Sequence, residues 1–447
     1  MGIIRNILVV LSFLFVCSLS AQTVNDTIVF ERDTYVKHIV KGGESLRSIA
    51  QLHKISISTI LDHNEIQRKL FYNQLLYIPI YPKQKRKKED KSQLSIHQQI
   101  ELKRGVKEDS SVINIALLLP FYVTLNDILI ASFEDPEDAK NIIYKKSALA
   151  LSFLQGVEIA VDSLRSLGKN IHLHIFDTAN DTLKVQQIIV SRALDSADII
   201  IGPLYSRNMI LVSNAYGQDT AKIIISPLSK NTKFLKGNLA TFQINSPFRV
   251  QSTRIRDFIM ETYRDKKIHV LVQKEARSYA LYIRELFKRN SKPVAIHTIT
   301  STHIDALRML MEDEQCVIIP SYNQVFVSKI LSSLGGIDSS FVVFGLNNWK
   351  KFDNLDTENL MQLRVHIPDP YYFDIEGEKE LSFIKLYEQK YKASANQYSF
   401  IGYNLILHFC TQNKVFKFSP YNDSSGMINT HCPIILYKDF SLLLIDY

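Results

Sequence analysis

Few residues in this sequence have the types and spacing that catalysis requires. His172 and His174 alternate along an apolar run, so on a strand both would face the same side of a sheet, but no third metal ligand accompanies them. Asp135 and Glu137 lie in a polar stretch in which both carboxylates are expected to be solvated. The sequence has no G-x-S-x-G, H-E-x-x-H, P-loop or Rossmann glycine motif. It therefore predicts a protein that is not an enzyme and that holds no metal or cofactor.

The positive charge of the chain is concentrated in one short segment. The 447 residues carry a formal net charge of +8, and residues 83–91 contribute a net +4 from six basic and two acidic side chains. Residues 82–91 contain no apolar side chain, so the segment 82–111 is interpreted as a basic polar linker. Because nucleic-acid binding needs basic residues on a folded surface, no nucleic-acid partner is expected.

The N-terminus has the pattern of a secretory signal peptide, assigned to residues 1–21. Arg5 precedes an apolar run over residues 7–16, and small residues follow it as a signal peptidase requires. The run is shorter than the ~20 residues that span a bilayer. The pattern predicts export to the periplasm or cell envelope, with no transmembrane segment after processing. Lipidation of Cys17 is left open.

A compact module of strand, helix, helix and strand is predicted within residues 35–81. Residues 36–40 alternate like one strand, and residues 75–80 form the other. Between them, residues 46–53 have the apolar spacing of one helix, and Ser56 can cap a second helix.

This module resembles a LysM domain, and the likeness is carried in register by residues 38–50, 55–56, 61, 64–66 and 73–79. LysM domains bind glycans that contain N-acetylglucosamine, so the resemblance implies peptidoglycan as a partner. It also implies a groove between the loop after the first strand and the loop before the second. The glycan-binding residues would be Gly43, Glu44, Ser45, Leu46, Ile66, Asn73, Gln74 and Leu75. Asn73 replaces the usual Gly but tolerates a left-handed backbone, and the alternative is a degenerate module that acts only as a spacer.

From residue 112 onward, apolar runs alternate with amphipathic helices in two rounds. The first round has runs at 112–119, 171–177, 198–203 and 222–227, and the second has runs at 267–272, 294–299, 316–320 and 341–345. Such runs separated by helices indicate a parallel sheet covered on both faces. The fold class is therefore α/β. Two lobes are expected, at about 112–240 with 374–447 and at about 249–365, with chain crossings near 241–248 and 366–373.

The domain at 112–447 resembles the type 1 periplasmic binding protein fold, especially its branched-chain amino-acid receptors. The likeness lies in residues 153–160, 177–178, 200–206 and 225–229, and the combination with LysM is similar to envelope proteins of Bacteroidetes-type bacteria. In such folds the ligand binds between the lobes, at the carboxyl ends of the strands. The resemblance places a small ligand near Phe121, Tyr122, Tyr205, Ser206, Ser226, Ser229, Tyr279, Ser321, Tyr322 and Trp349. The hydroxyls would suit a carboxylate and the rings a ligand ring, although serines beside Pro could equally serve only to end strands.

Three functions are compatible with this organisation. The sequence favours a non-catalytic envelope protein that binds peptidoglycan through LysM. Its receptor-like domain would bind a small ligand or regulate a protein partner in cell-wall metabolism. The alternative is a solute-binding receptor of an amino-acid-type ABC transporter, although a wall anchor fits poorly with a receptor that must reach its permease. A cell-wall hydrolase is a lesser alternative, because no catalytic motif is present. A disulfide among Cys316, Cys410 and Cys432 is left open.

Overall fold

The computed structural model describes residues 27–30, 33–55, 57–64, 70–79, 112–135, 142–300, 307–308, 315–337 and 341–446. These residues belong to two units, Met1–Gln93 and Leu94–Tyr447. The predicted signal peptide with Cys17, the predicted linker at 82–111 and Ile66 lie outside the described residues.

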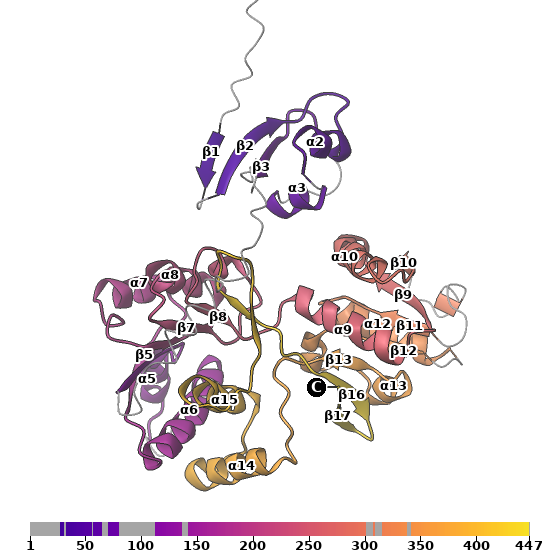
Figure 1. Ribbon diagram of the computed structural model, residues 1–447. Coiled ribbons are helices and arrows are strands. Elements are labelled where there is room, and N and C mark those ends of the chain that lie inside the picture. The colour runs from indigo at the N-terminus through magenta and orange to yellow at the C-terminus, as the bar shows by residue number, and fades with distance from the viewer. Residues whose placement is uncertain are drawn as a thin grey trace, which may run out of the picture. The chain divides into compact units, whose positions relative to one another are not determined.

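The first unit is a three-stranded antiparallel sheet with two helices (Figure 1). Its strands are β1 (Thr27–Phe30), β2 (Asp33–Ile39) and β3 (Leu75–Pro79), and helices α2 (Leu46–Leu52) and α3 (Ile57–His63) follow β2 in the chain. The predicted order of strand, helix, helix and strand is present, and β1 adds an edge strand. Apolar residues from the sheet and both helices form one core: Val36, Val40, Leu46, Ile49, Ala50, Ile60, Leu76 and Ile78.

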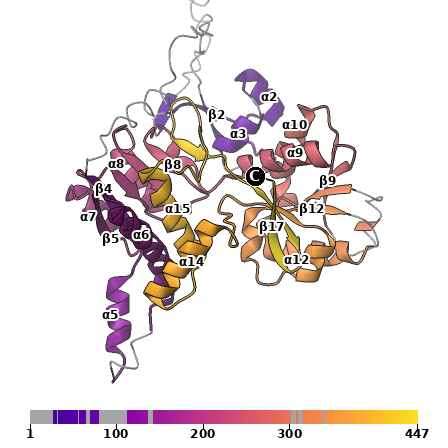
Figure 2. The same cartoon turned by 60° about the horizontal axis from the view of Figure 1, so that its bottom comes forward.

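The first sheet of the second unit is parallel apart from its edge strand β14. Its order is β14 (Phe418–Pro420), β15 (Met427–Asn429), β8 (Thr241–Gln243), β7 (Ile223–Ser226), β6 (Ile199–Ile201), β4 (Ile113–Leu119) and β5 (Ile171–Asp177). Hydrophobic clusters place α6 (Ala148–Ser166) and α15 (Gln397–Cys410) on one face, and α7 (Thr182–Val190) and α8 (Ser206–Tyr216) on the other. This sheet and its helices form lobe 1. Helix α14 (Glu378–Tyr391) packs on α6, and the short α5 (Val123–Ala131) projects from the lobe (Figure 2).

Two glycines let α6 and α15 approach closely within lobe 1. A Cβ atom on Gly156 would lie 1.9 Å from the Ser399 carbonyl oxygen, and one on Gly402 would lie 2.3 Å from the Phe153 carbonyl oxygen. Helix α6 with its preceding turn, Lys145–Ser166, is the one helix of the described residues that is long and apolar enough to cross a membrane, which the sequence prediction did not anticipate. Half of its apolar window is buried inside the protein, as befits a core helix covered by α15.

The second sheet of this unit forms lobe 2 and is parallel over its first five strands. Its order is β10 (Val294–Thr298), β9 (Lys267–Val272), β11 (Gln315–Ile318), β12 (Val342–Phe344), β13 (His366–Pro368), β16 (Ile434–Lys438) and β17 (Ser441–Asp446). One face is covered by α12 (Gln324–Gly335) and α13 (Thr357–Gln362), and the other by α9 (Phe248–Thr262) and α10 (Arg277–Lys288). The predicted α/β class with two helix-covered sheets is therefore confirmed.

The C-terminal strands join a different lobe from the one that the sequence suggested. Residues 374–447 were expected in lobe 1, but β16 pairs with β13, and β17 pairs with β16, in lobe 2. The chain therefore crosses between the lobes three times: after β8, after β13 and after β15. Only the first two crossings were expected, because the apolar pattern of a strand does not reveal which sheet it joins.

None of the three described cysteines forms a disulfide. Cys316 and Cys432 are buried, and Cys410 is half-buried. Burial raises the pKa of the Cys316 and Cys410 thiols to about 12, so both stay protonated at neutral pH. These thiols act as small apolar groups and not as nucleophiles.

Candidate functional site

Backbone hydrogen bonds hold together the two LysM loops that the sequence predicts to bind glycan. The Val40 N–H donates to the Gln74 carbonyl, and the Asn73 N–H donates to the Val40 carbonyl, each over 2.9 Å. Asn73 has a φ of 63°, so it adopts the left-handed conformation that Gly supplies elsewhere in the family. Gly43, in the first loop, has a φ of 85°. Two left-handed residues therefore shape the loops near the point where they meet.

A chain of polar side chains fixes the first loop. The Glu44 carboxylate accepts hydrogen bonds from the Lys41 N–H (2.8 Å) and from His38 Nε2 (2.9 Å). His53 Nε2 in turn lies 3.0 Å from His38 Nδ1. The Lys41 N–H and then the His38 ring hold the pKa of Glu44 below its ordinary value, and burial lowers the pKa of His53. Glu44 therefore sets the shape of the predicted glycan-binding loop.

Two of the predicted glycan-binding residues support the LysM fold itself. Ser45 caps α2, because its Oγ accepts a hydrogen bond from the Ser48 N–H (3.2 Å). Leu46 is buried in the core of the module. Substituting either residue would disturb α2 before it affected a bound glycan.

Two exposed aromatic side chains stand beside the second loop and were not among the predicted residues. Phe71 and Tyr72 are 64% and 73% exposed. The Phe71 N–H donates to the Gln74 side-chain oxygen (2.9 Å), which ties this pair to the loop, and Leu75 then begins β3. Exposed aromatic rings offer flat apolar faces suited to sugar rings. The available signal was a pair of consecutive aromatic residues directly before Asn73.

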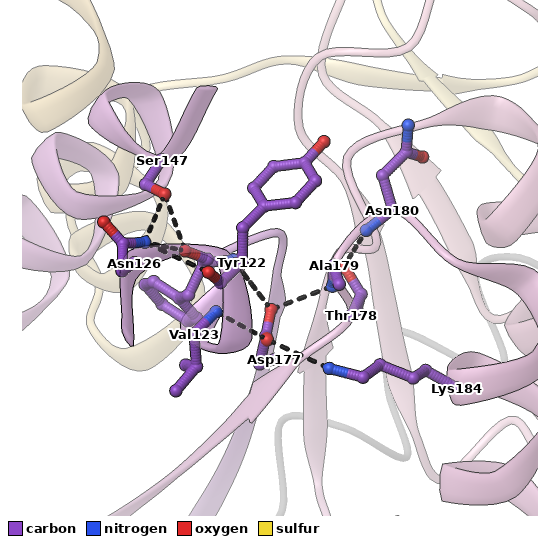
Figure 3. A network of polar contacts seen from close by, with 10 residues as sticks. Tyr122, Val123, Asn126, Ser147, Asp177, Thr178, Ala179, Asn180 and Lys184 are labelled. Carbon is purple, nitrogen blue, oxygen red and sulfur yellow. Dashed lines mark hydrogen bonds and ion pairs between the residues drawn. The ribbon is translucent and has the colours of Figure 1, made fainter. Parts of the chain in front are cut away.

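In lobe 1, one carboxylate organises the carboxyl ends of β4 and β5 (Figure 3). Five groups donate hydrogen bonds to the oxygens of Asp177 over 2.8 to 3.2 Å: the N–H groups of Phe121, Tyr122, Val123 and Ala179, and the ammonium of Lys184. Burial would raise the pKa of Asp177, but these N–H groups and Lys184 hold it below its ordinary value. Asp177 is thus an ionised, fully engaged acceptor that fixes the turn after β4.

The turn held by Asp177 is strained. Tyr122, Ala179 and Asn180 have φ values of 53°, 45° and 53°, which cost energy for residues other than Gly. The Tyr122 ring extends away from the Asp177 carboxylate, on the side of Asn180 (Figure 3). Burial, with a contribution from Tyr205, raises the pKa of the Tyr122 hydroxyl. Strain of this kind collects at functional sites, and Asp177, which the sequence did not assign to a site, positions Tyr122.

Ser206 and Ser229, predicted from two different strand ends, meet in lobe 1. Their Oγ atoms are 2.5 Å apart. Tyr205 directly precedes α8 and is 43% exposed. Ser226, the last residue of β7, is fully buried, and its Oγ has no hydrogen-bond partner among the residues that the structure describes. The structure therefore brings Tyr122, Tyr205, Ser206 and Ser229 together, whereas Ser226 is fully buried.

Two of the aromatic residues predicted to face a ligand pack in the hydrophobic cores of the lobes instead. Trp349 is 1% exposed within the core of lobe 2, where its Nε1–H donates to the Ser321 carbonyl (3.1 Å). Phe121 is 9% exposed in the core of lobe 1 and also lines an apolar groove of about 420 Å³ beside α5. Both residues follow strands, as predicted, but burying a large apolar ring is more favourable in free energy than exposing it at a strand end. Neither ring is placed to stack on a ligand between the lobes.

The lobes touch through two lysine–tyrosine pairs that the sequence prediction did not include. Lys230 Nζ of lobe 1 lies 4.8 Å from the ring centre of Tyr322 in lobe 2. Lys351 Nζ of lobe 2 lies 5.5 Å from the ring centre of Tyr398 in lobe 1 and 3.5 Å from its hydroxyl. The Tyr322 ring also packs edge-on against Tyr279. In the sequence, Lys230 directly follows the predicted site residue Ser229, which could have indicated a lysine at this interface.

Known proteins resemble the two parts of the chain separately. The LysM domain model matches residues 38–79, and comparison with curated proteins finds no match. In structure, the chain is similar to a branched-chain amino acid ABC transporter protein from Rhodospirillum rubrum, with a TM-score of 0.56 and 12% identity, covering 75% of this chain and 100% of that one. It is also similar to full-length LpoA from Haemophilus influenzae (TM-score 0.51, 12% identity, 78% of this chain and 61% of that one) and to an ABC transporter substrate-binding protein from Desulfitobacterium hafniense (0.50, 14%, 75% and 100%). The chain therefore combines a LysM domain with a domain of the type 1 periplasmic binding protein-like fold.

Proposed function

We propose that this protein is a non-catalytic component of the cell envelope that binds peptidoglycan through its LysM domain. The observation that carries the proposal is the pair of LysM loops joined at Val40 by backbone hydrogen bonds. Backbone amides in these loops can bond the acetamido group of N-acetylglucosamine, and Phe71 and Tyr72 offer exposed rings to the sugar faces. Export by residues 1–21 to the periplasm belongs to the same proposal, and an N-terminus beginning near residue 22 in the mature protein would support it.

The large domain, in this proposal, is a receptor that binds a small ligand or a protein partner of cell-wall metabolism without turnover. Its support is the cluster of Tyr122, Tyr205, Ser206 and Ser229 in lobe 1, within a fold shared with substrate-binding proteins and LpoA. Movement of one lobe against the other would convert occupancy into a change of shape that a partner can recognise.

A solute receptor of an ABC transporter is the second candidate, because structural neighbours of the large domain carry that name. The LysM domain argues against it. A solute receptor has to reach its permease, whereas attachment to peptidoglycan restricts where the large domain can go. The two candidates differ in a measurable property, namely whether the whole chain is retained on the cell wall.

The test is co-sedimentation of the full chain with purified peptidoglycan sacculi. Asn73→Gly keeps the left-handed turn and should sediment like the wild type. Asn73→Val places a β-branched side chain at a φ of 63°, which costs roughly 1–3 kcal/mol and should distort the second loop. We expect this variant to bind sacculi about tenfold more weakly, with an unchanged thermal transition of the large domain. Wild-type chain that stays in the supernatant, or equal sedimentation of both variants, contradicts the proposal.

A further inference from the structure

Each lobe of the large domain presents one lysine to a tyrosine of the other lobe. Lys230 follows β7 in lobe 1 and stands over Tyr322, and Lys351 ends a short 3-10 helix of lobe 2, Asn347–Lys351, and stands over Tyr398. The arrangement is reciprocal, so the contact between the lobes places two ammonium groups at one interface. Cation–π contacts of this kind stabilise a lysine only modestly while it remains solvated.

Neither of these two lysines has a carboxylate partner among the described residues, whereas Lys350, which directly precedes Lys351, has one. Lys350 lies 2.5 Å from the Asp369 carboxylate, which is 1% exposed. Lys351, the next residue, instead contacts the ring and hydroxyl of Tyr398, and Lys230 contacts the Tyr322 ring. Lys350 therefore neutralises the buried Asp369 carboxylate, whereas no carboxylate of the described residues pairs with Lys230 or Lys351.

The two charges act on one another. Burial first, and then the positive charge of Lys351, lower the pKa of Lys230 below its ordinary value. Contact between the lobes therefore brings like charges together, which opposes that contact. A negative charge placed between the two ammonium groups would replace this repulsion with attraction and stabilise the contact between the lobes.

We propose that Lys230 and Lys351 together form a binding site for a small anion that carries at least two negative charges, with one lysine supplied by each lobe. This inference rests on the proposed receptor function and assigns it a ligand class, namely a phosphate ester or a molecule with several carboxylates. The hydroxyl of Ser229, directly before Lys230, and that of Ser206, 2.5 Å from it, are placed to add hydrogen bonds.

The same charges disfavour a neutral zwitterion such as leucine. The ammonium group of an α-amino acid is bound most favourably by a carboxylate of the protein. Asp177 and Asp369, two carboxylates of the domain with little exposure, already hold Lys184 and Lys350. The ammonium of an amino acid between the lobes would instead face two further positive charges, which is unfavourable.

The experiment measures dissociation constants of citrate, pyrophosphate and leucine for the full chain, by calorimetry at constant physiological ionic strength. Lys230→Met and Lys351→Met each remove one charge and keep an unbranched side chain. Lys288→Met, at a lysine of α10 that is 76% exposed, is the charge-matched control. We expect at least one of the two anions to bind the wild type more tightly than leucine. Each interface variant should bind that anion about tenfold more weakly, whereas the control should match the wild type.

The two anions separate the possible sources of negative charge. Tighter binding of citrate identifies a carboxylate ligand, and tighter binding of pyrophosphate identifies a phosphate ligand. The inference is overturned if neither anion binds, if leucine binds most tightly, or if the interface variants bind the anion as well as the wild type does. Co-sedimentation with sacculi, measured on the same variants, tests the proposed peptidoglycan function separately, so that failure of one is not confused with failure of the other.

Discussion

The LysM loops and the lobe interface of the large domain are built in opposite ways. The LysM loops lie within residues 38–79, and their arrangement rests on backbone hydrogen bonds and left-handed turns. The lobe interface instead joins side chains from distant segments, such as Lys230 of lobe 1 and Tyr322 of lobe 2, which meet only because the chain crosses between the lobes three times. A site made from local backbone geometry is therefore robust to changes elsewhere, whereas a site made between lobes depends on the packing of the whole domain.

The LysM loops and the lobe interface should differ most in their response when α6 and α15 are forced apart. In Gly156→Leu, the new side chain would begin 1.9 Å from the Ser399 carbonyl oxygen, at the start of α15. We expect a loss of roughly 3 kcal/mol in the unfolding free energy of the large domain, together with loss of the Lys351–Tyr398 contact. Urea denaturation followed by tyrosine fluorescence measures this loss, and sedimentation with sacculi should persist because LysM is a separate unit.

The control for this substitution lies on the same helix. Ser166→Leu changes an exposed residue at the end of α6 and should alter stability by less than about 0.5 kcal/mol. If Gly156→Leu abolished sedimentation as completely as it destabilised the large domain, the separation between the two regions would be wrong.

Most of the fold was predictable from the sequence because its signals are local. The apolar runs near 113–119 and 267–272 are strands within a residue of the expected bounds, and helices lie between them as the alternating pattern indicated. The last two strands were assigned to the wrong lobe. An apolar pattern predicts that β16 and β17 are strands, but their partner β13 is selected by the path of the third crossing, which has no sequence signature.

The candidate sites were also predictable to different degrees, because the sequence reveals local backbone features but not the packing of distant segments. The LysM pattern anticipated the left-handed turn at Asn73, which depends on a residue type at one position. Trp349 was wrongly placed facing a ligand, because its position after β12 was readable but its burial was not. Lys230 and Lys351 were overlooked, since the pairing of each with a tyrosine of the opposite lobe depends on how the lobes are oriented.

A moderate loss of stability is expected when the second crossing loses a hydrogen bond to lobe 1. Tyr371 follows β13, and its hydroxyl donates to the Pro227 carbonyl over 2.7 Å. Tyr371→Phe leaves that carbonyl without its donor, which should cost about 1 kcal/mol in the large domain. The measurement is the shift in the urea midpoint. Tyr72→Phe, which removes an exposed LysM hydroxyl, is the matched control and should shift nothing. An equal shift in both variants would show that the Pro227 contact contributes no specific stability.

The smallest expected effect is a loss of LysM stability in mild acid. Burial lowers the pKa of His53 below its ordinary value of 6.5, so the folded state favours the neutral ring. A lowered histidine pKa provides stability that is complete above about pH 6.5 and declines as the pH falls through that value towards the folded pKa. The Lys41 N–H and the His38 ring lower the pKa of Glu44 below 4.5, and this contribution is lost at still lower pH, as the carboxylate becomes protonated. Both groups therefore act in the same direction.

Hydrogen–deuterium exchange of the full chain, corrected for the intrinsic effect of pH, follows this loss in peptides covering residues 36–55. Protection should fall between about pH 7 and pH 5.5, and His53→Gln, which removes the titrating ring, should flatten the change. His172→Gln, at an exposed histidine on β5 of lobe 1, should leave the LysM profile as it is in the wild type. Because Glu44, His38 and His53 fix the loop at residues 41–45, exchange should rise there before it rises in β2. Simultaneous loss of protection in the loop and in β2 would instead indicate global unfolding of the module. The hydrogen bonds among Glu44, His38 and His53 would then have no separate role in holding the predicted glycan-binding loop.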